Sequence, residues 1–278
     1  TGVPQNSESK SQMIGFNNLG RMGRLANQMF QYASLKGIAR HHGYDYMISY
    51  HADFMDDGIG NMLRTELFDS FDLKVRTGIY EAPTLTERHF HFDKELFDQC
   101  PDNIVLQGYF QTEKYFKHIE DEIRQDFTFK DAILNPCKEM MEDVENPIAL
   151  HVRRTDYVTN SANHPPCTLD YYKKALSNFE AYRNVIVFSD DPAWCSQQEL
   201  FSGNNFMISE NEDNRLDLCL MSLCDDFIIA NSTFSWWGAW LSANVDKEVI
   251  APRQWFGAEG YTKIHDTKDV TPDGWTRI

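Results

Sequence analysis

The sequence predicts an α/β protein built from two domains. Apolar runs of a few residues, typical of buried strands, alternate with segments of helical periodicity along most of the chain. Several of these runs end abruptly in polar or glycine-containing segments, as strands do where a parallel sheet opens into a ligand site. The length of 278 residues and the apolar content of 42% suffice for two domains, each with its own core.

The first domain is predicted from a strand, a loop, a helix and a second strand. Residues 1–11 are polar and are expected to form a frayed tail. A strand over 13–16 leads into a loop over 17–24 that contains two glycines. Apolar residues at helical spacing then predict a helix from Leu25 that stops at Gly43, followed by a strand over 44–48. This βαβ unit places the loop where ligands or anions bind.

The middle of the chain is less regular, and few elements can be placed between residues 51 and 105. Residues 106–111 predict a strand that runs into a helix capped by Thr112 and extending to about Phe127. A charged helix over 131–146 should end at Pro147. We place the domain boundary there, with a first domain over 1–146 and a second over 147–278.

The second domain restarts the alternation of strands and helices. Strands are predicted over 148–152, 185–188, 227–230 and 249–252, and helices over 169–179, 216–224 and 234–243. This order predicts a largely parallel sheet covered by helices.

Charge narrows the possible ligands. The formal net charge of −16 opposes binding to nucleic acid or to an anionic membrane through the general surface, so an anion site must be a local basic pocket. Arg153 and Arg154 directly follow the predicted strand over 148–152, and their planar guanidinium groups match phosphate oxygens. Alternatively, the two arginines belong to a surface ion-pair cluster.

Residues 227–240 predict a second phosphate cradle. An apolar strand runs into Asn231, Ser232 and Thr233 and then into a helix, so free backbone N–H groups and hydroxyls converge at the positive end of the helix dipole. Alternatively, Ser232 or Thr233 only caps a helix whose tryptophans lie in the core.

Two acidic positions accompany these motifs. Asp217 can accept the two hydrogen bonds that guanine offers from N1–H and its exocyclic amine, or it can serve the dipole at the start of a helix. Asp190, after the strand over 185–188, is a candidate for shaping the site, although Asp-Pro is also ordinary turn chemistry.

Processing and redox signals are few. Neither an apolar signal core nor a run of about 18 apolar residues occurs, so no secretory signal or membrane span is expected. The six cysteines show no metal-binding spacing and favour reduced structural thiols. We therefore expect a cytoplasmic protein, or a Golgi-lumenal catalytic domain if the chain is a trimmed one.

Four motifs, taken together and in this order, resemble the glycosyltransferase family 11 α-1,2-fucosyltransferases. They are Gly23-Arg24-Leu25-Ala26-Asn27-Gln28-Met29-Phe30-Gln31-Tyr32-Ala33, Leu106-Gln107-Gly108-Tyr109-Phe110-Gln111, His151-Val152-Arg153-Arg154-Thr155-Asp156-Tyr157 and Asn231-Ser232-Thr233-Phe234-Ser235-Trp236-Trp237-Gly238-Ala239-Trp240. The resemblance covers most of the chain from about 13 to 250. It implies a GT-B fold of two Rossmann-like domains facing across a cleft, with the first on the acceptor side. It further implies GDP-β-L-fucose as donor substrate, no metal or resident cofactor, and inversion to an α-1,2 link on a terminal galactose or similar sugar.

The resemblance also implies roles for single residues. Arg153 would grip the diphosphate with support from Arg154, and His151 would contact the nucleotide near its ribose or base. The remaining donor contacts would come from Asp190, Asp217, Asn231, Ser232, Thr233, Phe234, Ser235, Arg24, Asn27 and Gln28, with Asn27 reaching the fucose or diphosphate. The family usually has glycine where this chain has Ala26, so either φ is negative there or the loop differs.

The catalytic base is open at this point. Asp156 is the first candidate because it lies on the arginine loop, with His164 and Glu66 behind it, but it could equally be an ion-pair partner that orients Arg153 or Arg154. Arg153 and Asn27 complete the expected catalytic set.

Other functions compete with the transferase. A non-catalytic sugar-binding protein on the same fold would use exposed aromatic residues for stacking. A protein O-fucosyltransferase shares the arginine and first-loop motifs, whereas a dinucleotide-dependent oxidoreductase is disfavoured because Gly20-Arg21-Met22-Gly23 lacks the GxGxxG spacing. The expected partners are GDP-fucose and a glycan acceptor, with no nucleic acid; the oligomeric state is open.

Overall fold

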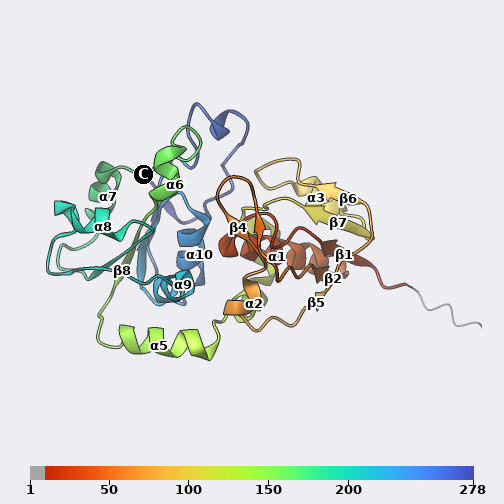
Figure 1. The fold of residues 1–278 in the computed structure, drawn as a ribbon, viewed down its shortest axis with the longest axis horizontal. Coiled ribbons are helices and arrows are strands. Elements are labelled where there is room, and N and C mark those ends of the chain that lie inside the picture. The colour runs from red at the N-terminus through yellow and green to blue at the C-terminus, as the bar shows by residue number, and fades with distance from the viewer. Residues whose placement is uncertain (1–9) are drawn as a thin grey trace, which may run out of the picture. The chain divides into compact units, whose positions relative to one another are not determined.

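The structure, a computed structural model, describes residues 10–278, so most of the predicted tail over 1–11 lies outside the described residues. The chain forms two compact α/β units (Figure 1). The first contains the described residues up to Glu66 together with Lys74–Arg88 and Phe92–Glu120. The second contains Leu67–Leu73, His89–His91 and Asp121–Ile278.

The first unit is built on a five-stranded parallel sheet of order β5-β2-β1-β7-β6. Its strands are β1 (Met13–Phe16), β2 (Asp45–Ile48), β5 (Arg76–Thr77), β6 (Thr84–Thr86) and β7 (Ile104–Gln107). A separate antiparallel hairpin pairs β3 (Met55–Asp56) with β4 (Met62–Leu63). Its helices are α1 (Leu25–His42), α3 (Lys94–Gln99) and the 3₁₀ turns η1 (Glu113–Tyr115) and η2 (Lys117–Ile119). The predicted βαβ unit is confirmed, with β1 at its predicted bounds and β2 beginning one residue later.

Helix α1 is buried on almost every side, which its sequence alone does not suggest. It ends at Gly43, whose φ of 73° is the left-handed conformation that glycine adopts freely. A Cβ atom added at Gly37 would lie 1.9 Å from the carbonyl oxygen of Tyr115, so the chain passes directly over the helix at this glycine. The imidazole of His118 also bonds to the carbonyl of Gly37 at 2.9 Å.

The second unit is built on a six-stranded parallel sheet of order β10-β9-β8-β11-β12-β13. The strands are β8 (Ile148–Val152), β9 (Val185–Ser189), β10 (Phe206–Ile208), β11 (Asp226–Ile228), β12 (Val249–Ala251) and β13 (Thr276–Arg277). The helices are α2 (Leu67–Ser70), α4 (Glu120–Asp126, which begins at the last residue of the first unit), α5 (Asp131–Met141), α6 (Thr155–Thr159), α7 (Leu169–Leu176), α8 (Pro192–Ser196), α9 (Asn214–Ser222) and α10 (Thr233–Leu241), with 3₁₀ turns η3 (Glu199–Phe201) and η4 (Tyr261–Lys263). The predicted parallel sheet is therefore confirmed.

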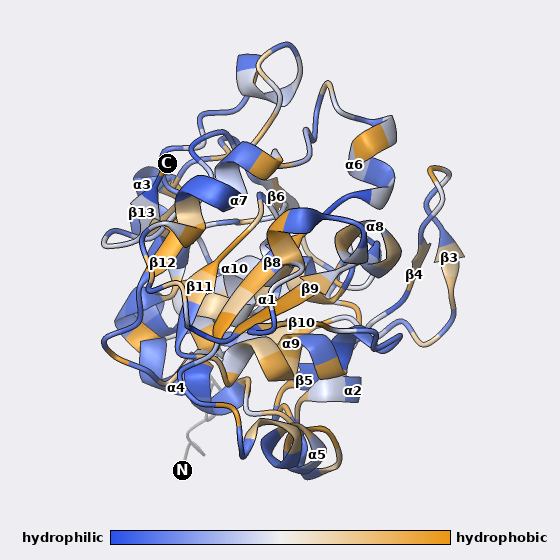
Figure 2. Ribbon diagram, turned by 90° about the vertical axis from the view of Figure 1, so that its left-hand side faces the viewer, coloured by the Kyte–Doolittle hydropathy of each residue, from blue (hydrophilic) through white to orange (hydrophobic). Residues whose placement is uncertain are grey.

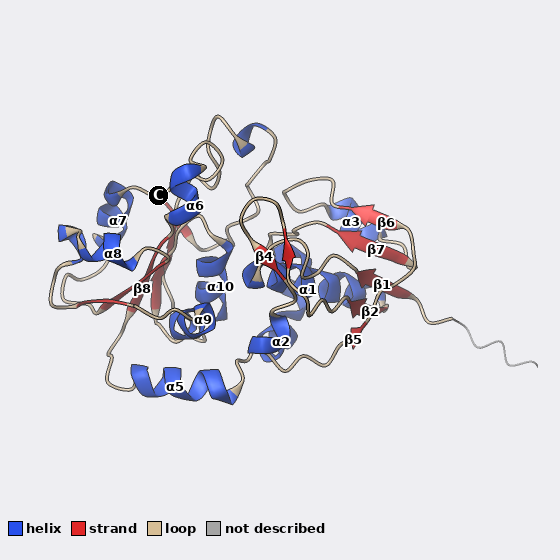
Figure 3. Ribbon diagram, viewed as in Figure 1, coloured by secondary structure: helices blue, strands red, loops and turns tan. Residues whose placement is uncertain are grey.

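Helices cover both faces of this second sheet. Figure 3 shows α7 and α8 on one face and α9 and α10 on the other, as right-handed crossovers require. The central strands β8, β9, β11 and β12 are strongly apolar (Figure 2). Because side chains alternate along a strand, Leu150 and Val152 enter the core beneath α7 while His151 points to the opposite face. The chain runs from β8 to β9 in one direction and returns to β11 on the other side, so β8 and β11 flank the point where strand order reverses.

Two predicted helices are wrong in part. The helix expected over 112–127 is broken into η1, η2 and α4, because Phe116 leaves the helical region with φ −135° and ψ 3° where the chain packs over Gly37. Thr112 nevertheless caps the first turn by accepting from the N–H of Lys114 at 3.3 Å. Helix α5 ends at Met141 and not at Asn146, whose φ of 46° is left-handed.

The domain boundary at residues 146 and 147 stays a prediction. In the structure, α5 packs against α9 of the second unit. The thiol of Cys137 on α5 contacts the carbonyl of Leu216 on α9 at 3.7 Å. Helix α5, which precedes the predicted boundary, therefore belongs with the second sheet.

Candidate functional site

Asp190 organises the loop that follows β8. This carboxylate lies just beyond the end of β9, beside the end of β8, because the two strands pair in register through Val152 and Ser189. Asp190 accepts hydrogen bonds from Nη1 of Arg153 at 2.5 Å, from the backbone N–H of Arg154 at 2.9 Å, and from the N–H and hydroxyl of Thr155 at 3.1 and 2.6 Å. Burial alone would raise the pKa of Asp190, but the hydrogen bonds from Thr155 and the charge of Arg153 lower it, so the group stays ionised.

Arg153 is held at the carboxyl edge of the second sheet by two carboxylates and an aromatic ring. Its Nη2 lies 2.5 Å from Oδ1 of Asp156, three residues along the chain, while Nη1 contacts Asp190. The guanidinium carbon lies 5.1 Å from the centre of the Tyr157 ring, a cation–π contact. The guanidinium is therefore fixed in orientation before any ligand arrives, and its side chain keeps 30% of its surface exposed.

Arg154 has separate partners. Its guanidinium stacks 3.9 Å from the centre of the Trp194 ring and its Nε lies 3.4 Å from Asp191. Asp191 is also the N-cap of α8, where it accepts from the N–H of Trp194 at 3.2 Å. Both adjacent arginines are thus held by residues that follow β9.

His151 connects β8 to the N-terminus of α10. Its Nδ1 lies 2.8 Å from the hydroxyl of Ser235, and its ring lies 5.5 Å from that of Phe234. Burial lowers the pKa of His151 to about 3; the charge of Asp190 opposes this shift and that of Arg153 adds to it, so the imidazole is neutral at physiological pH.

The turn between β11 and α10 is fastened to the arginine loop. The hydroxyl of Tyr157 donates to the carbonyl of Asn231 at 2.9 Å, and burial raises the pKa of this phenol to about 12, which keeps it a donor. Ser232 caps α10 by accepting from the N–H of Phe234 at 3.3 Å. The two sequence motifs, about 80 positions apart in the chain, therefore meet at the point where strand order reverses.

Asn231 holds the turn by internal bonds. Its amide nitrogen donates to the carbonyls of Pro165 and Trp255, both at 3.0 Å, and its amide oxygen accepts from the thiol of Cys167 at 3.6 Å. These contacts engage both donors of the amide. They account for the burial of Asn231 without a ligand, so its expected contact with the donor substrate stays a prediction.

Asp217 lies in the first turn of α9, as expected, and Asp213 is the N-cap of this helix. Its Oδ1 accepts from the hydroxyl of Ser209 at 2.7 Å and from the amide of Asn211 at 3.0 Å. Burial raises the pKa of Asp217, partly offset by these two hydrogen bonds. Ser209 follows β10, so the carboxylate lies at the same edge of the sheet as Asp190, which follows β9.

In the first unit, hydrogen bonds from the start of α1 hold the glycine loop over 17–24. Gln28 is fully buried and fixes this loop: its amide donates to the carbonyls of Gly23 and Arg64 at 3.2 and 2.8 Å and accepts from the N–H of Glu66 at 2.8 Å. Asn27 accepts from the amide of Gln111 at 3.1 Å.

Two positions, one at the end of this loop and one at the start of α1, answer questions left by the sequence. Arg24 is more than half exposed and lies 3.8 Å from Glu66, an alternative base that here serves as an ion-pair partner. Ala26 lies within α1 and has a negative φ, since among the described residues only Asn103, Phe110 and Asn146 are non-glycine residues with positive φ. An alanine is therefore unstrained at this position.

Other groups at the edge of the second sheet were not identified from the sequence. Thr155, Tyr157 and Trp194 each contact one of the arginines or their partner Asp190. The position of Thr155 and Tyr157 shortly after the arginine pair could have indicated their roles. Nothing in the sequence around Trp194 indicates its contact with Arg154. His164, an alternative base, stacks on Tyr157 with ring centres 5.0 Å apart, and burial lowers its pKa.

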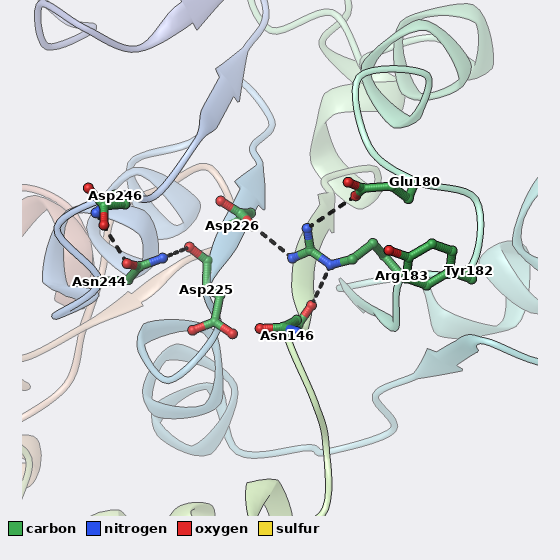
Figure 4. Close-up of a pocket in the computed structure, with 8 residues that line it drawn as sticks. All are labelled: Asn146, Glu180, Tyr182, Arg183, Asp225, Asp226, Asn244 and Asp246. Atoms are coloured by element: carbon green, nitrogen blue, oxygen red, sulfur yellow. Dashed lines mark hydrogen bonds and ion pairs between the residues drawn. The ribbon is translucent and has the colours of Figure 1, made fainter.

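A hollow of about 450 Å³ lies at the opposite, amino-terminal edge of the second sheet (Figure 4). Four of its side chains are acidic, and its one arginine, Arg183, is paired with Asp226 at 2.7 Å and with Glu180 at 3.8 Å. It is lined by Asn146, Glu180, Tyr182, Arg183, Asp225, Asp226, Asn244 and Asp246. An excess of negative charge makes this hollow unsuitable for a diphosphate.

In the described part of the chain, no group of three or more His, Cys, Asp or Glu side chains is arranged to hold a metal ion. Within residues 10–278, no helix combines the length and apolar composition needed to cross a bilayer. All six cysteines lie among the described residues, and none of them is paired in a disulfide.

The chain is similar in sequence to known glycosyltransferases. The family model described as "Glycosyl transferase family 11" matches residues 3–278. The O-antigen biosynthesis glycosyltransferase WbnK of Escherichia coli is 36% identical over 194 residues, which are 65% of this chain and 62% of that protein, so the match spans less than two thirds of this relative. An α-1,2-colitosyltransferase of Escherichia coli is 33% identical over 92% of this chain and 96% of its own. The galactoside α-(1,2)-fucosyltransferase 2 of Sus scrofa is 26% identical over 87% and 74%.

Solved structures resemble the fold. The fucosyltransferase NodZ from Bradyrhizobium superimposes with a TM-score of 0.52 at 12% identity, covering 83% of this chain and 93% of that one. POFUT1 in complex with GDP-fucose gives a TM-score of 0.51 at 13% identity, covering 88% and 98%. The fold is therefore of the GT-B type expected from the sequence, with two parallel-sheet units.

Proposed function

The chain belongs to glycosyl transferase family 11, and we propose that it is an inverting α-1,2-fucosyltransferase. It moves L-fucose from GDP-β-L-fucose to the 2-hydroxyl of a terminal galactose, or of a similar sugar, on a glycan. One observation supports this most: a preoriented guanidinium pair and the N-terminus of α10 are joined at the carboxyl edge of a parallel sheet in an otherwise acidic protein.

The reaction is a single displacement. The acceptor hydroxyl attacks C1 of fucose on the face opposite the leaving group, the C1–O bond to GDP breaks, and the hydroxyl proton passes to a base or to solvent. Arg153, supported by the N–H groups at the start of α10, stabilises the negative charge that develops on the diphosphate. Arg154 adds positive charge nearby, and Asp190 keeps Arg153 in place.

The nucleotide contacts are assigned by their position along the sheet. Ser232, Thr233, Phe234 and Ser235 supply hydroxyl and N–H donors for the phosphates. Asp217 accepts from the guanine base. The neutral His151, which lies on β8, contacts the phosphate-binding turn through the hydroxyl of Ser235. Asn231 acts through the turn it fastens, and the roles of Arg24, Asn27 and Gln28 toward the donor stay predictions.

The relatives favour a second donor sugar. The α-1,2-colitosyltransferase is similar over nearly the full length of both chains, whereas the galactoside fucosyltransferase is more distant. Colitose lacks one hydroxyl of fucose, so the two sugars can share the same nucleotide contacts. We keep fucose as the first proposal and make the sugar an outcome of the test.

Calorimetry and product analysis test the proposal. Wild-type protein should bind GDP, and incubation with GDP-fucose and a panel of β-galactosides should give an α-1,2-linked fucoside, identified by NMR. Arg153→Ala should lower the rate by about 10²- to 10³-fold and weaken GDP binding. A product formed only with the colitose donor would redirect the assignment to that sugar. Binding of GDP without transfer to any acceptor would favour a non-catalytic protein, and transfer to a protein hydroxyl would favour a protein O-fucosyltransferase.

A further inference from the structure

The motif over 106–111 has no role in the reaction as described so far, and Glu87 contacts it directly. Glu87 follows β6 at the carboxyl edge of the first sheet, next to β7, which ends at Gln107. One oxygen of its carboxylate accepts from the backbone N–H of Tyr109 at 3.2 Å and the other accepts from the N–H of Phe110 at 2.9 Å. Each oxygen thus has its own donor in the turn.

This turn adopts a backbone conformation that needs such support. Phe110 has a φ of 52°, which costs free energy for a bulky residue, and Gly108 has a φ of 154°. A Cβ atom at Gly108 would lie 2.5 Å from Cβ of Glu87, so the glycine is required for this close approach. The residue after Phe110 is Gln111, whose amide donates to Asn27 on α1 at 3.1 Å. The glutamate therefore fixes a turn that itself contacts the first-loop motif.

We propose that Glu87 is a positioning residue for the transfer reaction, whose ionised carboxylate holds the turn Gly108–Gln111 in the conformation that transfer requires. The proposal rests on the proposed function. It gives the motif over 106–111 a role, since Glu87 fixes its backbone and Gln111 orients Asn27. Tyr109, which is 40% exposed, is presented to solvent beside them.

The surroundings of Glu87 make this support depend on pH. Burial raises its pKa to about 7, although the two N–H groups act in the opposite direction, and the negative charge of Asp93 adds to the increase. Asp93 itself is paired with Arg88 at 2.9 Å, and Arg88 also contacts Glu95 at 3.2 Å. Above about pH 7 the carboxylate accepts both bonds. Below it, the added proton occupies one oxygen and weakens one of the two bonds.

The test is the pH profile of kcat/KM for a β-galactoside acceptor such as lactose, at saturating GDP-fucose, between pH 6 and 8.5. Wild-type activity should rise across this range with a midpoint near 7. Glu87→Gln carries an amide that accepts one bond and opposes the other, as the protonated acid does, so its activity should be about tenfold lower at pH 8 and lack this rise. Glu87→Asp keeps an ionisable carboxylate and should retain a pH-dependent rise. Glu81→Gln, an exposed change before the same strand, is the matched control and should follow the wild type.

Calorimetry with GDP separates the possible failures. The contacts proposed above for the guanine base and for the turn Ser232–Ser235 lie in the second unit. Glu87→Gln should therefore bind GDP with nearly the wild-type affinity, which also shows that the variant is folded. An unchanged pH profile in Glu87→Gln would overturn this inference and leave the transferase assignment intact. Wild-type protein without GDP binding or transfer would instead overturn the proposed function.

Discussion

The carboxylate of Asp190 and the guanidinium of Arg153 are 2.5 Å apart, and this pair links the ends of two adjacent strands. Asp190→Asn keeps the shape of the side chain but removes its charge. Charge-assisted hydrogen bonds contribute about 1.5–3 kcal/mol, so we expect the KM for GDP-fucose to rise by about 10- to 100-fold. Asp246→Asn, an exposed change at the opposite edge of the same sheet, should leave KM unchanged. An equal effect of both changes would contradict the role of Asp190.

Asp156 contacts Arg153 at 2.5 Å and keeps 62% of its side chain exposed, which favours an orienting role over that of a catalytic base. Removal of a general base lowers kcat by about 10²- to 10⁴-fold. We expect Asp156→Asn to lower kcat by less than about tenfold, because exposed ion pairs contribute little free energy. Single-turnover kinetics with GDP-fucose measure this directly, and a loss of about 10²-fold or more at unchanged GDP affinity would restore Asp156 as the base.

Asp217 should determine which nucleotide binds. If its carboxylate accepts from guanine, Asp217→Ala removes these bonds while the phosphate contacts remain. We expect the affinity for GDP to fall by about 10- to 100-fold, consistent with the loss of hydrogen bonds to a charged group, while any affinity for ADP should change little. Ser209→Ala, which removes one internal partner of Asp217, should have a smaller effect. Calorimetric titration with both nucleotides provides the comparison.

His151 should make the ligand-free protein less stable in mild acid. Its pKa is about 3 in the folded protein against an ordinary value of 6.5, so the unfolded chain binds more protons between these values. Stability from this group is complete above pH 6.5 and decreases as the pH falls toward 3. Between about pH 7.5 and 5 the loss is about 2 kcal/mol.

Thermal unfolding at the two pH values measures this effect. His151→Asn should show a smaller fall of melting temperature on acidification than the wild type. His89→Asn, which changes an exposed histidine, should match the wild type. Equal falls in all three proteins would show that other groups dominate the acid response.

The structure leaves no space for a methyl group at Gly37. Alanine in place of glycine normally stabilises a helix by about 1 kcal/mol. Here the added Cβ would lie 1.9 Å from the Tyr115 carbonyl, so Gly37→Ala should destabilise the protein by about 2 kcal/mol or more. Gly43→Asn, at the left-handed end of the same helix, should cost less because asparagine tolerates this conformation. The melting temperatures of the two variants should therefore differ clearly.

Local sequence patterns predicted the elements that are buried along their whole length. The strands over 13–16 and 148–152 have their predicted bounds because every residue in them is buried, which requires an unbroken apolar run. Strands β6 and β10 were missed because they are short and partly exposed, so no apolar pattern distinguishes them from loops. The break after Thr112 was missed because it depends on Gly37, which lies far away in the sequence.

The site was predictable where its residues adjoin a strand end, and not where the contacts are between distant segments. Arg153 and the turn Ser232–Ser235 stand next to recognisable strands. The hydrogen bond from Arg153 to Asp190 spans 37 positions, and no local pattern indicates it. Glu87 lies in the stretch with the fewest recognisable elements. Its role is indicated only by its contacts with the turn 22 and 23 positions later.

The ion pair between Arg153 and Asp156 also bears on how the enzyme treats small anions. Asp156 occupies Nη2 of Arg153 in the ligand-free protein, so a phosphate oxygen that binds this atom must displace the carboxylate. A free sulfate or orthophosphate must compete with this carboxylate, which is held at high local concentration by its position three residues away. A nucleotide sugar adds contacts through its base, its second phosphate and its sugar, so we expect it to displace Asp156 more readily than a free inorganic anion does.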